Sequence, residues 1–88
     1  MTDSHLRSII DRLIAMTKDE SDDIQRRLFE SDGRLIVKVF YNKISGFFTV
    51  VNAVSYESFK FELLDLAAIE VFEILYENRA VHQNNLKV

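Results

Sequence analysis

DLAAIEVFEILYENR, from Asp65 to Arg79, combines a helical pattern with more apolar side chains than one helix face can hold. At about 100° of rotation per residue, the apolar side chains cover more than half of the circumference. They are Ala67, Ala68, Ile69, Val71, Phe72, Ile74, Leu75 and Tyr76, while Glu70, Glu73 and Glu77 share one narrow strip. A helix on a sheet needs an apolar stripe of little more than 100°. We therefore predict a helix that ends near Asn78. The apolar side chains that the sheet cannot cover are expected to pack against another helix or another chain.

A second amphipathic pattern lies near the beginning of the chain. Apolar residues recur there at i, i+3, i+4, i+7 and i+8, and they are Leu6, Ile9, Ile10, Leu13 and Ile14. This spacing predicts a helix with one apolar face, and residues 2–4 supply candidate N-caps. Lys18 suits the C-terminal end of the helix dipole, whereas Asp19 and Glu20 would oppose it. We expect this helix to end at Lys18.

The segment between the two helices is rich in β-branched and aromatic residues, which favour strands. The predicted strands are Gln25–Glu30, Arg34–Asn42, Phe47–Val54 and the short Phe59–Glu62. Asp32-Gly33 is a strong hairpin turn signal. This order predicts an α+β fold, a two-layer sandwich of three or four antiparallel strands with both helices on one sheet face. Residues 1–80 form the single domain, and the polar residues 81–88 are expected to fray.

Alternation along the strands assigns residues to the two sheet faces. Leu28, Leu35, Val37, Val39, Tyr41, Phe48, Val50 and Val54 form the more apolar face, which we expect to carry the helices. The other face collects Phe29, Ile36, Phe40, Phe47 and Val51, mixed with Arg27, Arg34, Lys38, Thr49 and Ala53. It mixes charged and aromatic side chains, so it is a candidate interaction surface. A one-residue bulge would exchange part of these assignments.

Length and composition narrow the class of protein. The chain has 88 residues, a net charge of −3 and no cysteine, which predicts one domain without disulfides or thiolate metal sites. No signal peptide and no apolar run of 18 residues is visible, so we expect a cytoplasmic protein that does not enter the membrane. The basic residues are scattered, which argues against nucleic acid as a partner, because duplex-binding modules usually carry a basic stripe.

No group of residues in the sequence forms a known catalytic, metal or cofactor motif. His5 and His82 lie near opposite ends, and the acidic run at residues 19–23 lacks the ligand spacing and central glycine of an EF-hand loop. Gly33 and Gly46 are the only glycines and each is needed for a turn, so no phosphate-binding loop is present. We therefore expect no enzyme activity, no metal and no cofactor.

Three segments together resemble the YkuJ-like family, small uncharacterised proteins of low-GC Gram-positive bacteria. They are the helix pattern Leu6–Ile14, the strand Gln25–Glu30 before Asp32-Gly33, and Ile69–Leu75. The resemblance covers about residues 5–77. It implies a helix–antiparallel sheet–helix fold, and it implies no known activity, because the family is a domain of unknown function. No catalytic or binding residue can be carried over from it.

These observations favour a homodimeric protein-interaction module with an unknown protein partner. Its expected contact residues are Phe29, Arg34, Ile36, Lys38, Phe40, Phe47, Val71 and Ile74. The strongest competing interpretation is a monomer in which the first helix alone covers the surplus of the last. A different hypothesis is a regulator that senses a small anionic ligand or a nucleotide through Arg27, Arg34 and Lys38 around the aromatic residues. An enzyme is the third possibility.

Overall fold

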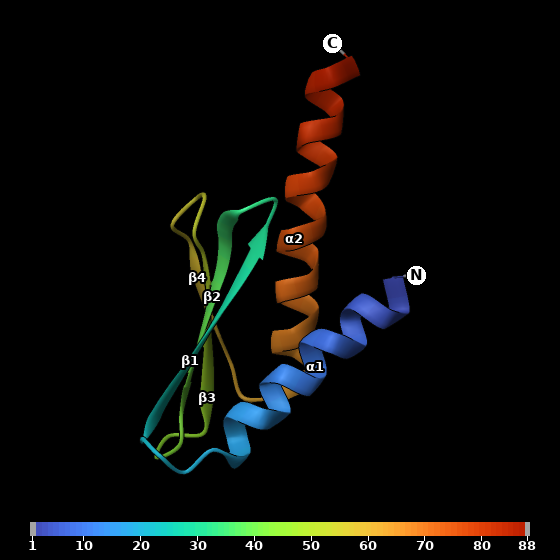
Figure 1. The fold of residues 1–88 in the computed structure, drawn as a ribbon. Coiled ribbons are helices and arrows are strands. Elements are labelled where there is room, and N and C mark those ends of the chain that lie inside the picture. The colour runs from blue at the N-terminus through green and yellow to red at the C-terminus, as the bar shows by residue number, and fades with distance from the viewer. Residues whose placement is uncertain (1, 88) are drawn as a thin grey trace.

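The computed structural model describes the backbone of residues 2–87 and the side chains of residues 5–77. Its elements are α1 (Thr2–Lys18), β1 (Ile24–Ser31), β2 (Arg34–Asn42), β3 (Phe47–Asn52), β4 (Ser58–Phe61) and α2 (Leu64–Lys87). The strands form one antiparallel sheet in the order β1-β2-β3-β4. Both helices lie on the same side of it, α1 over β1 and α2 over β2, β3 and β4 (Figure 1). The predicted α+β sandwich is confirmed, and its sheet has four strands.

Most element boundaries agree with the sequence prediction, and the C-terminal helix is the main difference. α1 ends at Lys18 and β2 has the predicted bounds, whereas β3 ends at Asn52, before the predicted Val54. α2 continues to Lys87 and projects beyond the sheet (Figure 1). The prediction that it ends near Asn78 is wrong, because no glycine or proline follows to interrupt the helix. Fraying at residues 81–88 stays a prediction. Among the described residues no helix is long and apolar enough to cross a membrane.

The apolar face of α1 is centred on Ile9, Leu13 and Met16, which are all buried. Leu6 and Ile10 pack against the core from its side. The prediction places Ile14 in this stripe and is wrong, since Ile14 is exposed. At about 100° per residue it lies roughly 120° from the centre of the buried stripe, whereas Met16 lies close to that centre.

Helix α2 buries one broad side, formed by Ala67, Ala68, Val71 and Ile74, against the sheet and α1. Phe72 and Leu75 are partly buried against the same core. The first helix therefore covers much of the apolar surplus of the last. Val71 and Ile74, expected to contact a partner, belong to this core. The apolar residues that remain exposed on α2 are Leu66, Ile69 and Tyr76.

A β-bulge in β2 corrects part of the predicted face assignment. Phe29 pairs with Val37 and Glu30 pairs with Leu35, so Ile36 is an extra residue on β2. Ile36, Val37 and Phe29 are all buried in the core beneath the helices. The prediction that Phe29 and Ile36 lie on the interaction face is wrong, because it assumed unbroken alternation across the hairpin.

The same bulge moves an apolar residue of β1 to the other face of the sheet. Leu28 pairs with Lys38 and is exposed, although it is predicted to lie under the helices. Val54, predicted on the same apolar face, lies in the turn after β3 and is also exposed. The helix-bearing face is therefore built around the centre of β2 and β3, where alternation is regular.

Candidate functional site

The face of the sheet that carries no helix is one candidate surface, which we call the open sheet face. Its side chains come from residues paired across the four strands. One row is Arg26, Phe40, Thr49 and Lys60, and the next is Leu28, Lys38, Val51 and Ser58. A third row, at the end where β3 begins, is Ile24, Asn42 and Phe47.

The open sheet face combines positive charge with apolar side chains. Arg26, Lys38 and Lys60 are its charged members, and no carboxylate occupies any of the three rows. Lys60 Nζ lies 5.7 Å from the centroid of the Phe47 ring, a cation–π distance. Phe40 and Phe47 are half-buried. Of the predicted interaction residues, the structure therefore brings together Lys38, Phe40 and Phe47.

The three cations predicted to hold an anion do not gather. Lys38 lies on the open sheet face, whereas Arg27 pairs with Val39 on the helix-bearing face. Arg34 is exposed at the start of β2, beside the hairpin turn. The anion site formed by these three residues is therefore not present in the fold.

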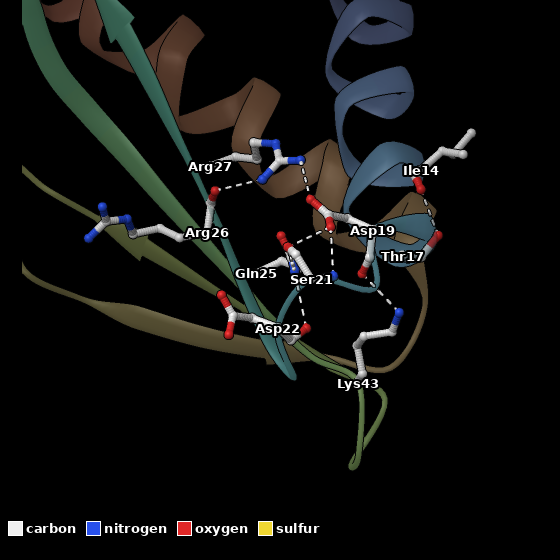
Figure 2. A network of polar contacts seen from close by, with 9 residues as sticks. All are labelled: Ile14, Thr17, Asp19, Ser21, Asp22, Gln25, Arg26, Arg27 and Lys43. Carbon is white, nitrogen blue, oxygen red and sulfur yellow. Dashed lines mark hydrogen bonds and ion pairs between the residues drawn. The ribbon is translucent and has the colours of Figure 1, made fainter.

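The connection between α1 and β1 is held by polar contacts around Asp19 (Figure 2). Its Oδ1 accepts hydrogen bonds from the Ser21 hydroxyl at 2.7 Å and the Ser21 N–H at 2.9 Å. Arg27 Nη2 lies 3.9 Å from Asp19 Oδ2, and Lys43 Nζ donates to the Asp19 carbonyl at 2.9 Å. The Ser21 hydrogen bonds, with smaller contributions from the positive charges of Arg27 and Lys43, lower the pKa of Asp19.

Gln25 anchors the other end of this connection from inside the protein. It is a buried polar residue, and its Nε2 donates to the Asp22 carbonyl at 3.1 Å and to Ser21 Oγ at 3.4 Å (Figure 2). The acidic run thus joins α1 to the sheet as an ordered structural element. Within the part of the chain that the structure describes, no three acidic or histidine side chains are grouped to hold a metal ion.

A cleft between the helices and the end of β1 is the second candidate site. It has a volume of about 350 Å³ and is lined by His5, Ser8, Ile9, Arg12, Phe29, Glu30, Ser31, Phe72, Leu75 and Tyr76. Half of these side chains are aliphatic or aromatic, and the polar ones come from α1 and β1. This size and this mixture are typical of small-molecule pockets.

Arg12 is the fixed cation of the cleft. Its guanidinium carbon lies 4.0 Å from the centroid of the Phe29 ring, and Nη2 donates to the Leu28 carbonyl at 2.8 Å. Partial burial and the neighbouring charge of Arg27 lower the pKa of the guanidinium, which nonetheless stays protonated. From the sequence, Arg12 is only an outward-facing residue of the first helix. The cleft joins elements that are far apart in the chain, so the sequence pattern does not indicate that Arg12 lines it.

The sequence matches one protein family, and the fold is similar to that of a solved structure. A family model described as a protein of unknown function (DUF1797) matches residues 9–75. The X-ray structure of the YkuJ protein from Bacillus subtilis is similar, with a TM-score of 0.72 and 27% sequence identity. The match covers 80% of this chain and 95% of that chain. No curated protein matches the sequence.

Proposed function

The chain belongs to the DUF1797 family of proteins of unknown function, and we propose that it acts by binding rather than catalysis, as a homodimeric interaction module of the cytoplasm. The supporting observation is a row of residues on the exposed side of α2, which we call the outer seam: Leu66, Ile69, Glu73 and Tyr76, of which Tyr76 also borders the cleft. Leu66, Ile69 and Tyr76 are 47%, 41% and 57% exposed. The four residues of the outer seam are spaced i, i+3, i+7 and i+10, which is the spacing of contact residues in paired helices of coiled coils.

A second copy of the chain suits the outer seam because the seam can pair with itself about a two-fold axis. Two α2 helices that cross at Ile69 would bury Leu66 and Ile69 of each copy. Glu73 lies one turn further along the same row, where crossing helices diverge, so its carboxylate would stay in contact with water. Complete burial of a fully exposed leucine or isoleucine side chain contributes about 1.5–3 kcal/mol, and Leu66 and Ile69, already more than half covered, would each gain about half of that. The four side chains of the two copies would together contribute about 3–6 kcal/mol, comparable with the lower end of the stability of a small domain, about 5–15 kcal/mol.

The proposed contact is narrower than the sequence predicts. Val71 and Ile74 are covered within the chain, so they give no reason for association. The outer seam is the part of the apolar surplus that α1 leaves exposed. The dimer therefore rests on Leu66, Ile69 and Tyr76 and not on the residues expected from the sequence.

Sedimentation velocity between about 1 and 100 µM tests this proposal. We expect a species of twice the 10.3 kDa chain mass, and we expect Ile69→Glu to shift the equilibrium to the monomer at least tenfold. Ile44→Glu is the matched control, because Ile44 is 80% exposed in the turn between β2 and β3. A wild-type chain that sediments at 10.3 kDa at every concentration contradicts the dimer.

The cleft supports a second candidate function, the sensing of a small anionic ligand. Arg12 places a fixed positive charge beside apolar walls, which suits a small molecule with an acidic group and an apolar body. A thermal-shift screen over nucleotides and anionic metabolites tests it. A shift that is lost in Arg12→Gln and kept in Arg34→Glu supports the cleft. The absence of a shift with every anion contradicts it.

A further inference from the structure

We propose that the open sheet face binds single-stranded nucleic acid. This inference does not depend on the outer seam, because α2 and the open sheet face lie on opposite sides of the sheet (Figure 1). A dimer through α2 would leave both open faces accessible. The argument rests on two properties of the face, its charge and its aromatic residues.

The charge of the open sheet face differs from that of the chain as a whole. The net charge of the chain is −3, yet the three rows contain Arg26, Lys38 and Lys60 and no carboxylate. Pairing this face with the same face of a second copy would bring cations against cations. A polyanion such as a phosphate backbone complements it instead.

The aromatic residues of the face lie on the two central strands. Phe40 is on β2 and pairs with Thr49 of β3, two residues from Phe47, so the two rings are diagonal neighbours. Aromatic rings on the face of a four-stranded sheet are a recurring platform on which unpaired bases stack, and Phe40 and Phe47 are each partly accessible on this face. Each ring has a cation nearby, because Lys60 lies over Phe47 and Arg26 pairs with Phe40. Bases and phosphates could therefore be bound side by side.

The same features favour a nucleic acid strand over an acidic peptide. A peptide carboxylate would use the cations but would leave the flat faces of Phe40 and Phe47 without a matching planar group. Asn42, Thr49 and Ser58 add polar groups that can contact base edges or sugars. The scattered basic residues in the sequence argue against a duplex-binding stripe. A single strand needs fewer cations when stacking contributes to binding.

Fluorescence anisotropy with a 5′-fluorescein-labelled 12-mer of uridine tests the proposal. Three phosphate contacts predict that log Kobs falls with log[NaCl] with a slope of about −2. We expect Lys38→Glu to weaken binding at least tenfold. Lys18→Glu makes the same charge change at the end of α1, on the helix-bearing side of the sheet, and we expect it to leave binding unchanged. Phe47→Leu keeps an apolar side chain but removes the ring, so we expect weaker binding with the same salt slope.

Several results would overturn the proposal. One is the absence of an anisotropy change at 100 µM protein and 50 mM NaCl. Another is equal weakening of binding by Lys18→Glu and Lys38→Glu, and a third is equally tight binding of a 12-base-pair duplex. Tight binding of a polyglutamate peptide that depends on Lys38 but not on Phe47 would assign an acidic protein as the partner instead. Circular dichroism and thermal unfolding of each variant would show whether its fold is intact. Ile69→Glu should keep its binding to the strand even as a monomer.

Discussion

Gly46 and Tyr56 occupy the same position in two turns that share one pattern of hydrogen bonds. The Gly46 N–H donates to the Asn42 carbonyl and the Tyr56 N–H donates to the Asn52 carbonyl, both at 2.7 Å. In each turn the asparagine side-chain oxygen accepts bonds from the amides two and three residues later. Both positions have positive φ, 78° at Gly46 and 69° at Tyr56. The second turn thus places a bulky residue where the first has glycine.

Tyr56→Gly should stabilise the protein by about 1 kcal/mol. The left-handed conformation costs an L-residue roughly 1–2 kcal/mol, and the greater flexibility of unfolded glycine offsets part of the gain. Tyr56 is 85% exposed, so little packing is lost. Urea unfolding measures the change in the free energy of unfolding. A loss of stability would mean that the Tyr56 ring makes a contact stronger than the strain.

Gly46→Ala is the reciprocal substitution and should destabilise by about 1 kcal/mol. No atom lies within 4 Å of the Cβ position that alanine would add. The expected cost therefore comes from the backbone conformation alone. An unchanged midpoint in urea would show that this turn relaxes to another conformation without cost.

The order of the elements could be predicted from the sequence because each one carries its own local signal. The period of 3.6 residues identified both helices, and Asp32-Gly33 fixed the first hairpin. The bulge at Ile36 could not be predicted, since no glycine marks it and both Ile36 and its neighbour Val37 are apolar. One extra residue there exchanged the burial of Leu28 and Phe29. The pairing of β1 with β2 determines which residues of β1 face the core, and alternation along β1 alone does not reveal it.

The bulge predicts opposite sensitivities for two apolar residues of the first hairpin. Ile36→Ala should destabilise by about 2–5 kcal/mol, the usual cost of truncating a buried isoleucine. Leu28→Ala should cost less than about 1 kcal/mol, because Leu28 is on the open sheet face and already 39% exposed. Uninterrupted alternation would predict the reverse order. Chemical unfolding of the two variants distinguishes these registers directly.

The cleft was beyond sequence prediction for a different reason. Its walls come from α1, β1 and α2, which meet only in the folded chain, and Arg12 is polar in an exposed helix position. The open sheet face was partly predictable, because Lys38, Phe40 and Phe47 lie on regular strands. Arg34 is the first residue of β2, so the position of its side chain depends on the geometry of the hairpin turn, which alternation along the strand does not describe.

Arg12→Gln should destabilise the protein by about 1–2 kcal/mol. The variant loses the cation over the Phe29 ring, about 0.5–1 kcal/mol at an exposed site, and the hydrogen bond to the Leu28 carbonyl, about 0.5–1.5 kcal/mol. Arg7→Gln is a matched control on the exposed part of α1. Equal unfolding free energies for the two variants would show that the contact between Arg12 and β1 contributes nothing.

Glu70→Gln should stabilise the protein at neutral pH and have no effect in acid. Partial burial, then the charges of Glu73, Glu77 and Glu57, raise the pKa of Glu70. The folded protein therefore holds this proton more tightly than the unfolded chain, and folding becomes less favourable as pH rises from the ordinary glutamate pKa through the raised pKa of Glu70.

Like-charge pairs three or four residues apart on a helix cost about 0.2–0.5 kcal/mol each, so Glu70→Gln is expected to gain stability of that size at pH 7. At about pH 3, more than one unit below the ordinary glutamate pKa of about 4.3, Glu70 is protonated in both states and the gain disappears. Thermal unfolding of both proteins at the two pH values measures this difference, with Asp11→Asn on exposed α1 as the control. A gain that persists in acid would mean that packing, rather than charge, favours glutamine at this position.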